Sequence, residues 1–226
     1  MARRKETSRV DLFVSSIRDW SGSNMRRFSF RRSIAPYDVL LAELLLRKTT
    51  ASQVDRVYPR LIERYADPFM LAKARQMDLS NLLAPLGIHS RGSAMIDLAR
   101  KIVDEHSGIV PSRKEDLLCL PGVGPYTCAV VRTFCFGKKE GMVDTNVARI
   151  LTRYFGYRPK TRRAHNDPQI ALLYAQLLEH QNPRLFHFGI LDYCSSICKA
   201  RNPNCLQCRM RTKCEFSRRL NRLGKS

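Results

Sequence analysis

The sequence predicts an all-α protein. Apolar residues recur at intervals of three or four over most of the chain, the period of a helix with one buried face. No segment shows the sustained apolar and polar alternation of a half-buried strand, and the periodic segments are bounded by Gly, Pro, Ser or Asn. With 226 residues, 44% of them hydrophobic, the chain can build one large or two small domains.

The first strong helical pattern covers residues 36–65 and predicts a pair of helices. Its apolar residues fall into two periodic segments that break between Thr49 and Ser52. Ser52 is the expected N-cap of the second helix, because a serine side chain can accept a hydrogen bond from a free backbone N–H.

Further helices are predicted along the rest of the chain, each from the same spacing and each ending at a helix-breaking or capping residue. They cover residues 77–86, 90–106, 112–120, 126–137, 146–156, 167–180 and 184–198.

The charge of the chain points to a polyanionic partner. There are 40 Lys and Arg residues against 20 Asp and Glu, a formal net charge of +20. A solvated surface rich in ion pairs would carry acids in comparable number, so nucleic acid is the expected partner. No apolar run is long enough to span a membrane, and the N-terminus lacks the apolar stretch of a signal peptide. We expect a soluble, intracellular protein with no membrane partner.

The cysteines fall into two groups with different expected roles. Cys119, Cys128 and Cys135 lie in or beside apolar stretches and are expected to pack in the core. Four others are separated by six, two and five residues in a short polar loop: Cys198, Cys205, Cys208 and Cys214. Thiolates so close together repel unless a metal centre neutralises them. From spacing alone, zinc and an iron–sulfur cluster both fit. Cys194 is expected to be packed, not ligating.

A glycine-rich turn joins two of the predicted helices at LPGVGPYTCA, residues 120–129. Gly122 and Gly124 can adopt positive φ and bring bare backbone close to a ligand. The N–H groups at the start of the following helix can bind a phosphate without reading a base. The alternative is an ordinary bend between two helices.

Three motifs together resemble the helix-hairpin-helix DNA glycosylases of the endonuclease III superfamily. They are LPGVG, the segment MVDTNVARILTRYFG that follows it, and the six, two, five cysteine spacing. The resemblance runs from about Pro36 to Cys214. It implies a [4Fe–4S] cluster in place of zinc, bound by Cys198, Cys205, Cys208 and Cys214.

The resemblance also implies a two-lobed fold. Residues 28–137 are expected to form a six-helix lobe that contains the helix-hairpin-helix. Residues 1–27 and 138–226 are expected to form the second lobe, which joins an N-terminal helix to the cluster loop at 198–214.

A glycosylase must extrude its nucleotide from the duplex, and the resemblance names residues for this step. Ile88 matches the position of an apolar wedge. Arg47 and Lys48 fall where relatives insert polar side chains beside the orphaned partner base. The alternatives are a loop residue that covers the core and two solvent-facing charges.

Three further residues match catalytic positions of the family. Asp144 corresponds to the carboxylate that stabilises the developing sugar cation and orients water, although it could equally be a helix N-cap. Glu43 is an acid in an otherwise apolar helix, and relatives that hydrolyse adenine place a general acid there. Tyr126 replaces the lysine whose amine forms a Schiff base in bifunctional relatives. This predicts a monofunctional enzyme, with a packed tyrosine as the alternative role for Tyr126.

The combination most resembles the thymine-DNA mismatch glycosylases, which act on T or U opposite G. The expected partner is double-stranded DNA with a mismatched or damaged base, and the expected state is a monomer, nucleoid-associated in a prokaryote. One departure is Phe28-Ser29-Phe30-Arg31, where relatives often have Phe-Pro-Trp-Arg. The alternatives are an adenine mismatch glycosylase without its C-terminal recognition domain and a non-catalytic lesion-binding protein.

Overall fold

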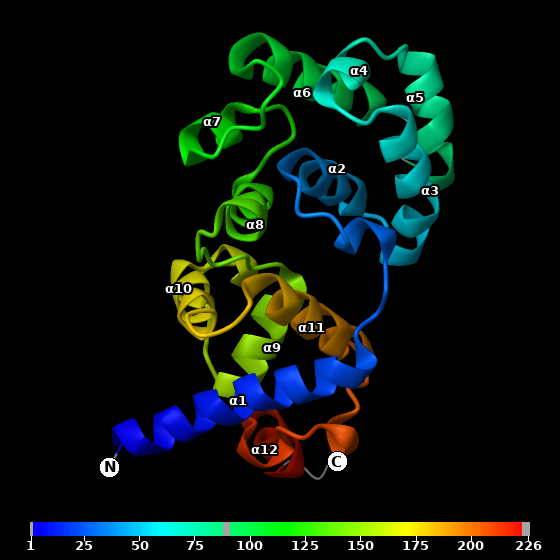
Figure 1. The fold of residues 1–226 in the computed structure, drawn as a ribbon. Coiled ribbons are helices and arrows are strands. Elements are labelled where there is room, and N and C mark those ends of the chain that lie inside the picture. The colour runs from blue at the N-terminus through cyan, green and yellow to red at the C-terminus, as the bar shows by residue number, and fades with distance from the viewer. Residues whose placement is uncertain (1, 88–90, 223–226) are drawn as a thin grey trace. The chain divides into compact units, whose positions relative to one another are not determined.

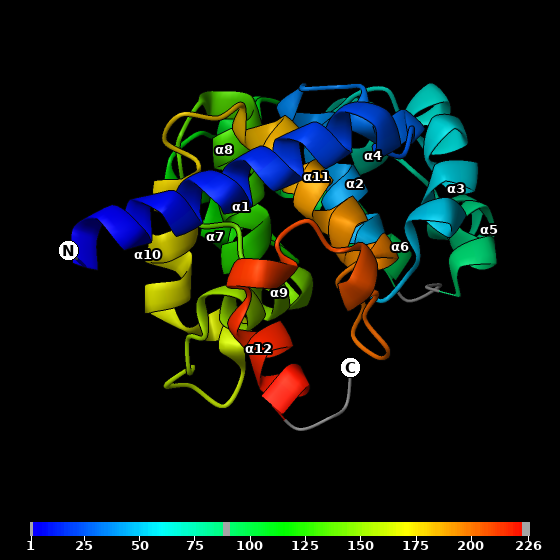
Figure 2. The ribbon, with the colours of Figure 1, turned by 90° about the horizontal axis from the view of Figure 1, so that it is seen from below.

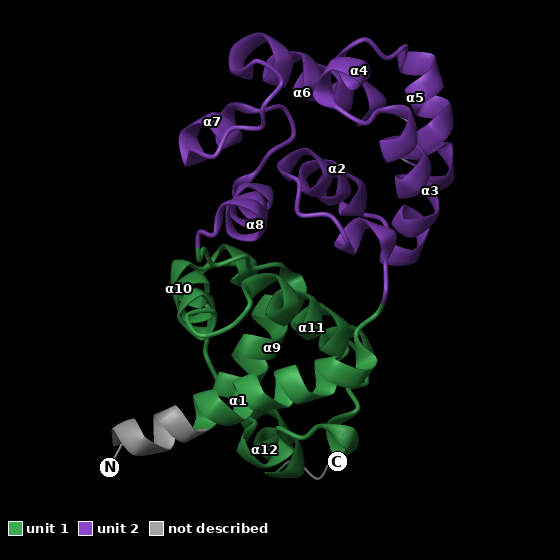
Figure 3. Ribbon diagram, in the orientation of Figure 1, with its two compact units in different colours: residues 1–26, 139–226 green, residues 27–138 purple. Residues whose placement is uncertain are grey.

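The computed structural model describes residues 2–87 and 91–222, with side chains from Arg9 onward. Every regular element in these ranges is a helix (Figure 1), so the predicted all-α class is confirmed. The chain divides into two compact units, which Figure 3 colours separately. Unit 1 comprises residues 1–26 and 139–226, and unit 2 comprises residues 27–138. No helix among the described residues is both long and apolar enough to cross a membrane.

Unit 2 is a helical bundle formed by one continuous segment. Its elements are η1 (Ser29–Arg31), α2 (Pro36–Leu46), α3 (Ala51–Arg64), α4 (Pro68–Ala72), α5 (Gln76–Leu83), η2 (Ala84–Leu86), α6 (Arg91–His106), α7 (Lys114–Cys119) and α8 (Pro125–Phe136). Helix α2 packs against α3 and α8, and α6 packs against α4 and α5. Leu40, Leu41 and Leu45 of α2 are fully buried, so this helix forms the centre of the unit 2 core.

Unit 1 is discontinuous, because it contains both ends of the chain. Its elements are α1 (Ala2–Asn24), α9 (Thr145–Phe155), η3 (Ala164–Asn166), α10 (Pro168–Leu177), α11 (Pro183–Ser196), η4 (Cys205–Gln207), η5 (Arg211–Lys213) and α12 (Glu215–Arg222). Figure 2 shows α1 crossing over α11, and it shows α12 beside α9. Both pairs are in contact.

An aromatic cluster holds α1 in unit 1. The fully buried ring of Phe13 packs against Tyr154, Phe155 and Phe186, at centroid separations of 5.2, 5.6 and 6.4 Å. Such ring contacts contribute beyond the apolar area that they bury. The N-terminal helix is therefore anchored to α9 and α11, far along the sequence.

A second long-range contact fixes the segment after α1. The Arg26 guanidinium lies 2.6 Å from the carboxylate of Asp192, whose side chain is fully buried. The Arg26 backbone N–H also donates to this carboxylate, at 2.8 Å.

Most predicted helices are present, with shifted boundaries. Thr50, not Ser52, caps α3: its hydroxyl accepts from the Gln53 backbone N–H, and the Gln53 side chain accepts in return from the Thr50 N–H. This reciprocal pairing is the capping box. The helical spacing did not predict α4 or α12, and α1 was implied only by the resemblance. Helix α12 has only eight residues and one buried side chain, Ser217, and its apolar pair Phe216 and Leu220 is too short a pattern to predict a helix.

Candidate functional site

The turn between α7 and α8 is a tight bend in unit 2. The Val123 backbone N–H donates to the Leu120 carbonyl at 3.1 Å, and Gly122 has φ of +78°. Gly124 is the N-cap of α8 with extended backbone, φ −97° and ψ 177°. The prediction of positive φ is therefore confirmed for Gly122 and wrong for Gly124.

Gly124 leaves open backbone at the start of α8. A Cβ added there would meet no atom of the described residues within 4 Å. Neither its conformation nor protein packing requires glycine at this position. The free space beside the first N–H groups of α8 is what close approach of a bulky anion requires.

A basic pocket adjoins this turn within unit 2. It has a volume of about 320 Å³. Its lining comprises Leu44, Arg47, Lys48, Arg91, Ala94, Met95, Pro121 and Gly122. The Arg47 guanidinium donates to the Gly122 carbonyl at 2.7 Å, which ties the end of α2 to the turn.

Lys48 and Arg91 add to the positive charge of this pocket. Lys48 has φ of +59°, a left-handed conformation that is strained for a side-chain-bearing residue and is enriched at functional sites. Arg91 donates to the Leu44 carbonyl at 3.0 Å. Burial and the nearby charge of Arg47 lower the pKa of Arg91. Arg91 was not predicted from the sequence, because a single cation at a helix start carries no pattern.

Glu43 and Tyr126 lie on two helices of unit 2 that pack together. Glu43 is half-buried on α2 between the buried Ala42 and Leu44. Tyr126 is half-buried in the first turn of α8, directly after Pro125. Since α2 contacts α8, one helix pair carries both residues.

Asp144 is the N-cap of α9 in unit 1 and is half-buried. Its Oδ1 accepts from the backbone N–H groups of Asn146 and Val147, at 2.9 and 2.7 Å. Its Oδ2 accepts from the Asn146 side-chain amide at 2.6 Å. Three donors therefore hold the carboxylate in one orientation. Asp144 therefore caps α9, and the same hydrogen bonds fix the position of its carboxylate.

A hydrogen-bonded chain runs from Asp144 to the cysteine loop. The Asn146 side-chain oxygen accepts from Arg149 at 3.0 Å, and Arg149 donates to the Cys198 carbonyl, also at 3.0 Å. Cys194 is buried and its thiol donates to the Asn146 carbonyl at 3.5 Å. Cys194 is thus packed in the core, as its position in the sequence predicted.

Two buried polar side chains adjoin this part of unit 1. The hydroxyl of Tyr174 lies 2.8 Å from Nδ1 of His187, and both residues are buried. Burial, and secondly the negative charge of Asp144, raises the pKa of Tyr174 far above its usual value. This pair was not predicted from the sequence, because both residues fall on apolar faces of predicted helices.

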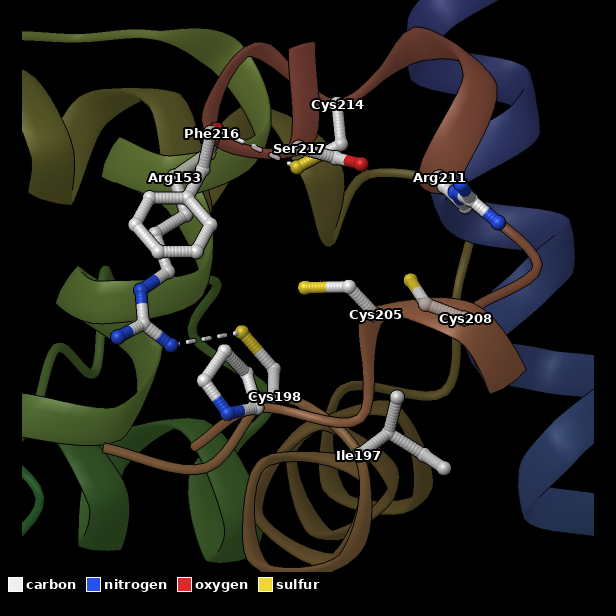
Figure 4. A pocket seen from close by; sticks show the side chains of 10 residues that line it. Arg153, Ile197, Cys198, Cys205, Cys208, Arg211, Cys214, Phe216 and Ser217 are labelled. Carbon is white, nitrogen blue, oxygen red and sulfur yellow. Dashed lines mark hydrogen bonds between the residues drawn. The ribbon is translucent and has the colours of Figure 1, made fainter. Parts of the chain in front are cut away.

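The four cysteines of the loop line one cavity of unit 1. Figure 4 shows the side chains of Cys198, Cys205, Cys208 and Cys214 around an open space. Among the described residues, no three potential ligands from His, Cys, Asp and Glu lie close enough to hold a single metal ion. Four thiols that line one cavity are a donor set that suits either a zinc ion or an iron–sulfur cluster.

Three of the four thiols of the cavity lie in surroundings that disfavour the thiolate form. Burial raises the pKa values of Cys205, Cys208 and Cys214. The Tyr193 hydroxyl donates to the Cys208 sulfur at 3.2 Å, and burial raises the pKa of Tyr193. A metal centre would supply the positive charge that the thiolate form requires.

Arg153 holds the cavity wall together. Its guanidinium donates to the carbonyls of Lys199 and Ala200, at 2.6 and 3.0 Å, and to the Cys198 sulfur at 3.6 Å. It also stacks on the Phe216 ring, 4.5 Å from the centroid. One side chain of α9 therefore links the cysteine loop to α12.

Other predicted residues lie elsewhere. Ile88 falls outside the described residues. Of the first cysteine group, Cys128 is buried, Cys135 is half-buried and Cys119 is exposed, so the core prediction is wrong for Cys119. Cys119 is the last residue of α7 and lies with Leu118 on its exposed side, while Leu117 and Leu120 are buried.

Comparison with known proteins matches these features to a family. The model of the HhH-GPD superfamily of base excision DNA repair proteins matches residues 41–168. A thymine-DNA glycosylase of Aeropyrum pernix is 39% identical over 83% of this chain and 85% of its own length. A thymine/uracil-DNA glycosylase of Methanothermobacter thermautotrophicus is 33% identical over 91% of this chain and 93% of its own.

A solved structure gives the same result for the fold. It is that of a thermostable thymine-DNA glycosylase, which matches with a TM-score of 0.88 at 32% identity, over 95% of this chain and 99% of its own. The resemblance seen in the motifs is therefore confirmed. The chain belongs to the HhH-GPD superfamily of base excision DNA repair proteins.

Proposed function

We propose that the protein hydrolyses the N-glycosidic bond of thymine or uracil opposite guanine in duplex DNA and leaves an abasic site. The observation that carries this proposal is the oriented carboxylate of Asp144, half-buried at the start of α9. Identities of 33–39% to thymine-DNA and thymine/uracil-DNA glycosylases support the choice of base. We further propose that it acts as a monomer and, in a prokaryotic cell, on nucleoid DNA.

Asp144 would act on the sugar. As the bond to the base breaks, positive charge develops at C1′ and the ring oxygen, and a fixed anion nearby stabilises it. The two backbone N–H groups and the Asn146 amide hold the carboxylate, so little reorganisation is needed during the reaction. The same carboxylate can orient the attacking water.

Glu43 and Tyr126 would act on the extruded nucleotide. A half-buried carboxyl on α2 can protonate the leaving base or hold a water molecule against it. Tyr126 offers a ring face and a hydroxyl, and it has no amine to attack C1′. Water is then the final nucleophile, and the DNA strand stays intact until it is treated with alkali.

The remaining site residues would hold the DNA. The bend at Gly122 and the open backbone at Gly124 suit a phosphate at the start of α8. Arg47 and Lys48 line the basic pocket next to this turn and would lie beside the orphaned partner base. Ile88 is proposed as the wedge from its place in the motif alone. We also propose the two lobes as expected, one of residues 28–137 and the other of residues 1–27 with 138–226.

We propose that Cys198, Cys205, Cys208 and Cys214 bind a [4Fe–4S] cluster. The four side chains line one cavity, and their six, two, five spacing is the one that the family resemblance associates with this cluster. When bound, the cluster would shape the loop that carries the cationic residues Arg201, Arg209, Arg211 and Lys213. About four iron and four sulfide per chain would be found in anaerobically purified protein. One zinc per chain and no sulfide would refute the cluster.

The reaction is tested by single-turnover base release. The duplexes carry T:G, U:G, A:G, A opposite 8-oxoguanine, or thymine glycol, and each reaction is analysed with and without alkali. Release from T:G or U:G, with strand breaks only after alkali, is the expected result. Strand cleavage without alkali would contradict the monofunctional mechanism.

Two other outcomes would favour the alternatives. Preferential release of adenine would identify an adenine mismatch glycosylase. Tight binding to mismatched duplex with no release of any base would identify a lesion-binding protein. The lesion-binding alternative gives the oriented carboxylate of Asp144 no role beyond capping α9, whereas both glycosylase alternatives use it on the sugar.

A further inference from the structure

Positive charge is concentrated in the loop that joins α9 to α10 in unit 1, drawn yellow-green in Figure 2. We call residues 158–163 the basic loop. Four exposed cations occur within these six residues: Arg158, Lys160, Arg162 and Arg163. No Asp or Glu occurs between Gly156 and Asn166 to offset them.

These four side chains are available for binding to another molecule. In the described part of the chain, none of them forms an ion pair or a side-chain hydrogen bond. Arg64 and Arg75 of unit 2, by contrast, both pair with Asp78, at 3.0 Å. No ion pair within the described residues therefore offsets the charge of the four side chains, and such clustered charge attracts external anions.

The basic loop is nonetheless anchored. Asp167 is 2% exposed and accepts from the Lys160 backbone N–H at 2.7 Å and from the Tyr157 hydroxyl at 3.3 Å. The hydrogen bond from Lys160 is the main cause of the lowered pKa of Asp167. At the far end, the Asn166 N–H donates to the Arg163 carbonyl at 2.8 Å. Because the backbone is already ordered, a ligand would not have to order it on binding.

The basic loop lies at the opposite end of α9 from Asp144. It follows α9, and the eleven residues of that helix separate it from the Asp144 N-cap by about 16 Å. The nearest acid of α12 is Glu215, which contacts Gly156. Glu215 already pairs with Arg9 at 3.6 Å and Arg218 at 3.1 Å, so it does not neutralise the basic loop.

We infer that the basic loop binds the phosphate backbone of the DNA substrate, away from the reacting base. This inference rests on the proposed function, because it takes duplex DNA as the ligand. Exposed, unpaired and ordered cations match the repeated charges of a phosphate backbone. The interaction would add affinity without selecting a sequence or a base.

The test compares two variants that lose the same charge. In the loop variant, glutamine replaces Arg158, Lys160, Arg162 and Arg163. In the control variant, glutamine replaces four exposed arginines of unit 2 that already pair with carboxylates: Arg64, Arg75, Arg100 and Arg113. Circular dichroism and thermal melting establish that both variants fold.

The measurement is the dissociation constant for a G-mismatched duplex at several salt concentrations. The duplex carries 2′-fluorothymidine, whose glycosidic bond resists hydrolysis. The slope of log K against log salt should decrease by about 0.9 for every phosphate that the variant no longer neutralises. We expect the loop variant to neutralise at least about two fewer phosphates and to bind on the order of tenfold more weakly at about 0.1 M salt. The control variant should retain the wild-type slope.

Several results would overturn the inference. An unchanged slope in the loop variant would do so, as would an equal decrease of the slope in both variants. Weaker binding to structured RNA with unchanged binding to duplex DNA would assign the basic loop to a different partner. These results are distinct from failure of the proposed glycosylase function. In that case the wild-type protein would release neither thymine nor uracil, whatever its affinity for the duplex.

A second variant tests the anchor. Asp167→Asn adds one positive charge to the net charge but weakens the acceptor for the Lys160 N–H. If order in the basic loop matters, this variant binds the duplex less tightly despite its higher charge. Equal or tighter binding in a folded variant would overturn the role of the anchor.

Discussion

Asp144 and Asp67 show how one residue type serves two purposes at the residue scale. Both are N-caps whose carboxylates accept from backbone N–H groups, Asp67 from Met70 at 2.8 Å. Only Asp144 is also held by a side-chain amide, that of Asn146. The sequence left capping and catalysis as alternatives for Asp144, yet the geometry makes them compatible.

The residue scale gives the first prediction. Asp144→Asn should reduce the single-turnover rate of base release by at least about a hundredfold, because the fixed negative charge is lost. Binding and folding should be retained, since asparagine is also a good N-cap. Asp67→Asn makes the same change at a cap of unit 2 and should leave the rate unchanged. A fully active Asp144→Asn protein would refute the assigned role.

Tyr126 gives a second prediction at this scale. Tyr126→Lys places an amine in the first turn of α8, where it can attack C1′ and form a Schiff base. The variant should cleave the strand without alkali, and borohydride should trap it on DNA. Tyr126→Phe controls for the loss of the hydroxyl and should form no adduct. Absence of trapping in a folded Tyr126→Lys protein would count against the position of Tyr126 at the sugar.

At the element scale, helical spacing predicted those helices that have a buried face. Helix α9 is typical, with Val147, Ile150, Leu151 and Tyr154 buried on one side. Spacing could not predict α12, which has almost no buried residues, or the five-residue α4. Helical spacing also could not predict backbone conformation in the turn, because the extended conformation of Gly124 depends on how α7 and α8 meet.

The residues of the candidate site also divide into those that the sequence predicts and those that only the structure reveals. Asp144, Tyr126 and the four cysteines stand in motifs and could be named from the sequence. Arg91 and the Tyr174–His187 pair could not, because their proximity depends on how the helices pack. The basic loop was visible only as composition, and its anchor on Asp167 became visible with the fold.

Arg153 gives a prediction about an element, the cysteine loop. Arg153→Met removes two hydrogen bonds to loop carbonyls and the stacking on Phe216. The loop should be destabilised by about 2 kcal/mol, and the purified protein should retain less iron. Arg100→Met, at an exposed site of unit 2, should retain iron at the wild-type level. Iron is measured by a colorimetric assay, and equal retention in both variants would contradict the role of Arg153.

At the scale of the whole molecule, the chain separates into a continuous unit and a discontinuous one. The discontinuous unit is closed by interactions between its two segments, among them Arg26 with Asp192 and Phe13 with Phe186. These interactions connect residues more than 150 positions apart, so each one closes a long loop of chain. Removing one of them should therefore affect unit 1 as a whole.

The ion pair makes this testable. Arg26→Met leaves the fully buried carboxylate of Asp192 without its cationic partner, and the free energy of unfolding of unit 1 should fall by about 3 kcal/mol. Combining it with Asp192→Asn should recover part of this stability, because a neutral amide is easier to bury. Urea denaturation monitored by tryptophan fluorescence suits this test, since Trp20 packs against Tyr193 in the same unit. Equal stability of the single variant and the wild type would contradict the prediction.

The discontinuity of unit 1 also bears on the order of events during synthesis. Residues 27–138 leave the ribosome as a complete unit and can fold while translation continues. Helix α1 emerges earlier, but the α11 surface that covers it is made more than 150 residues later. Until then the side chains of Phe13 and Ile17 lack the cover that leaves them 0% exposed in the folded protein. The nascent chain is therefore exposed to chaperones and proteases at its N-terminus for most of its translation.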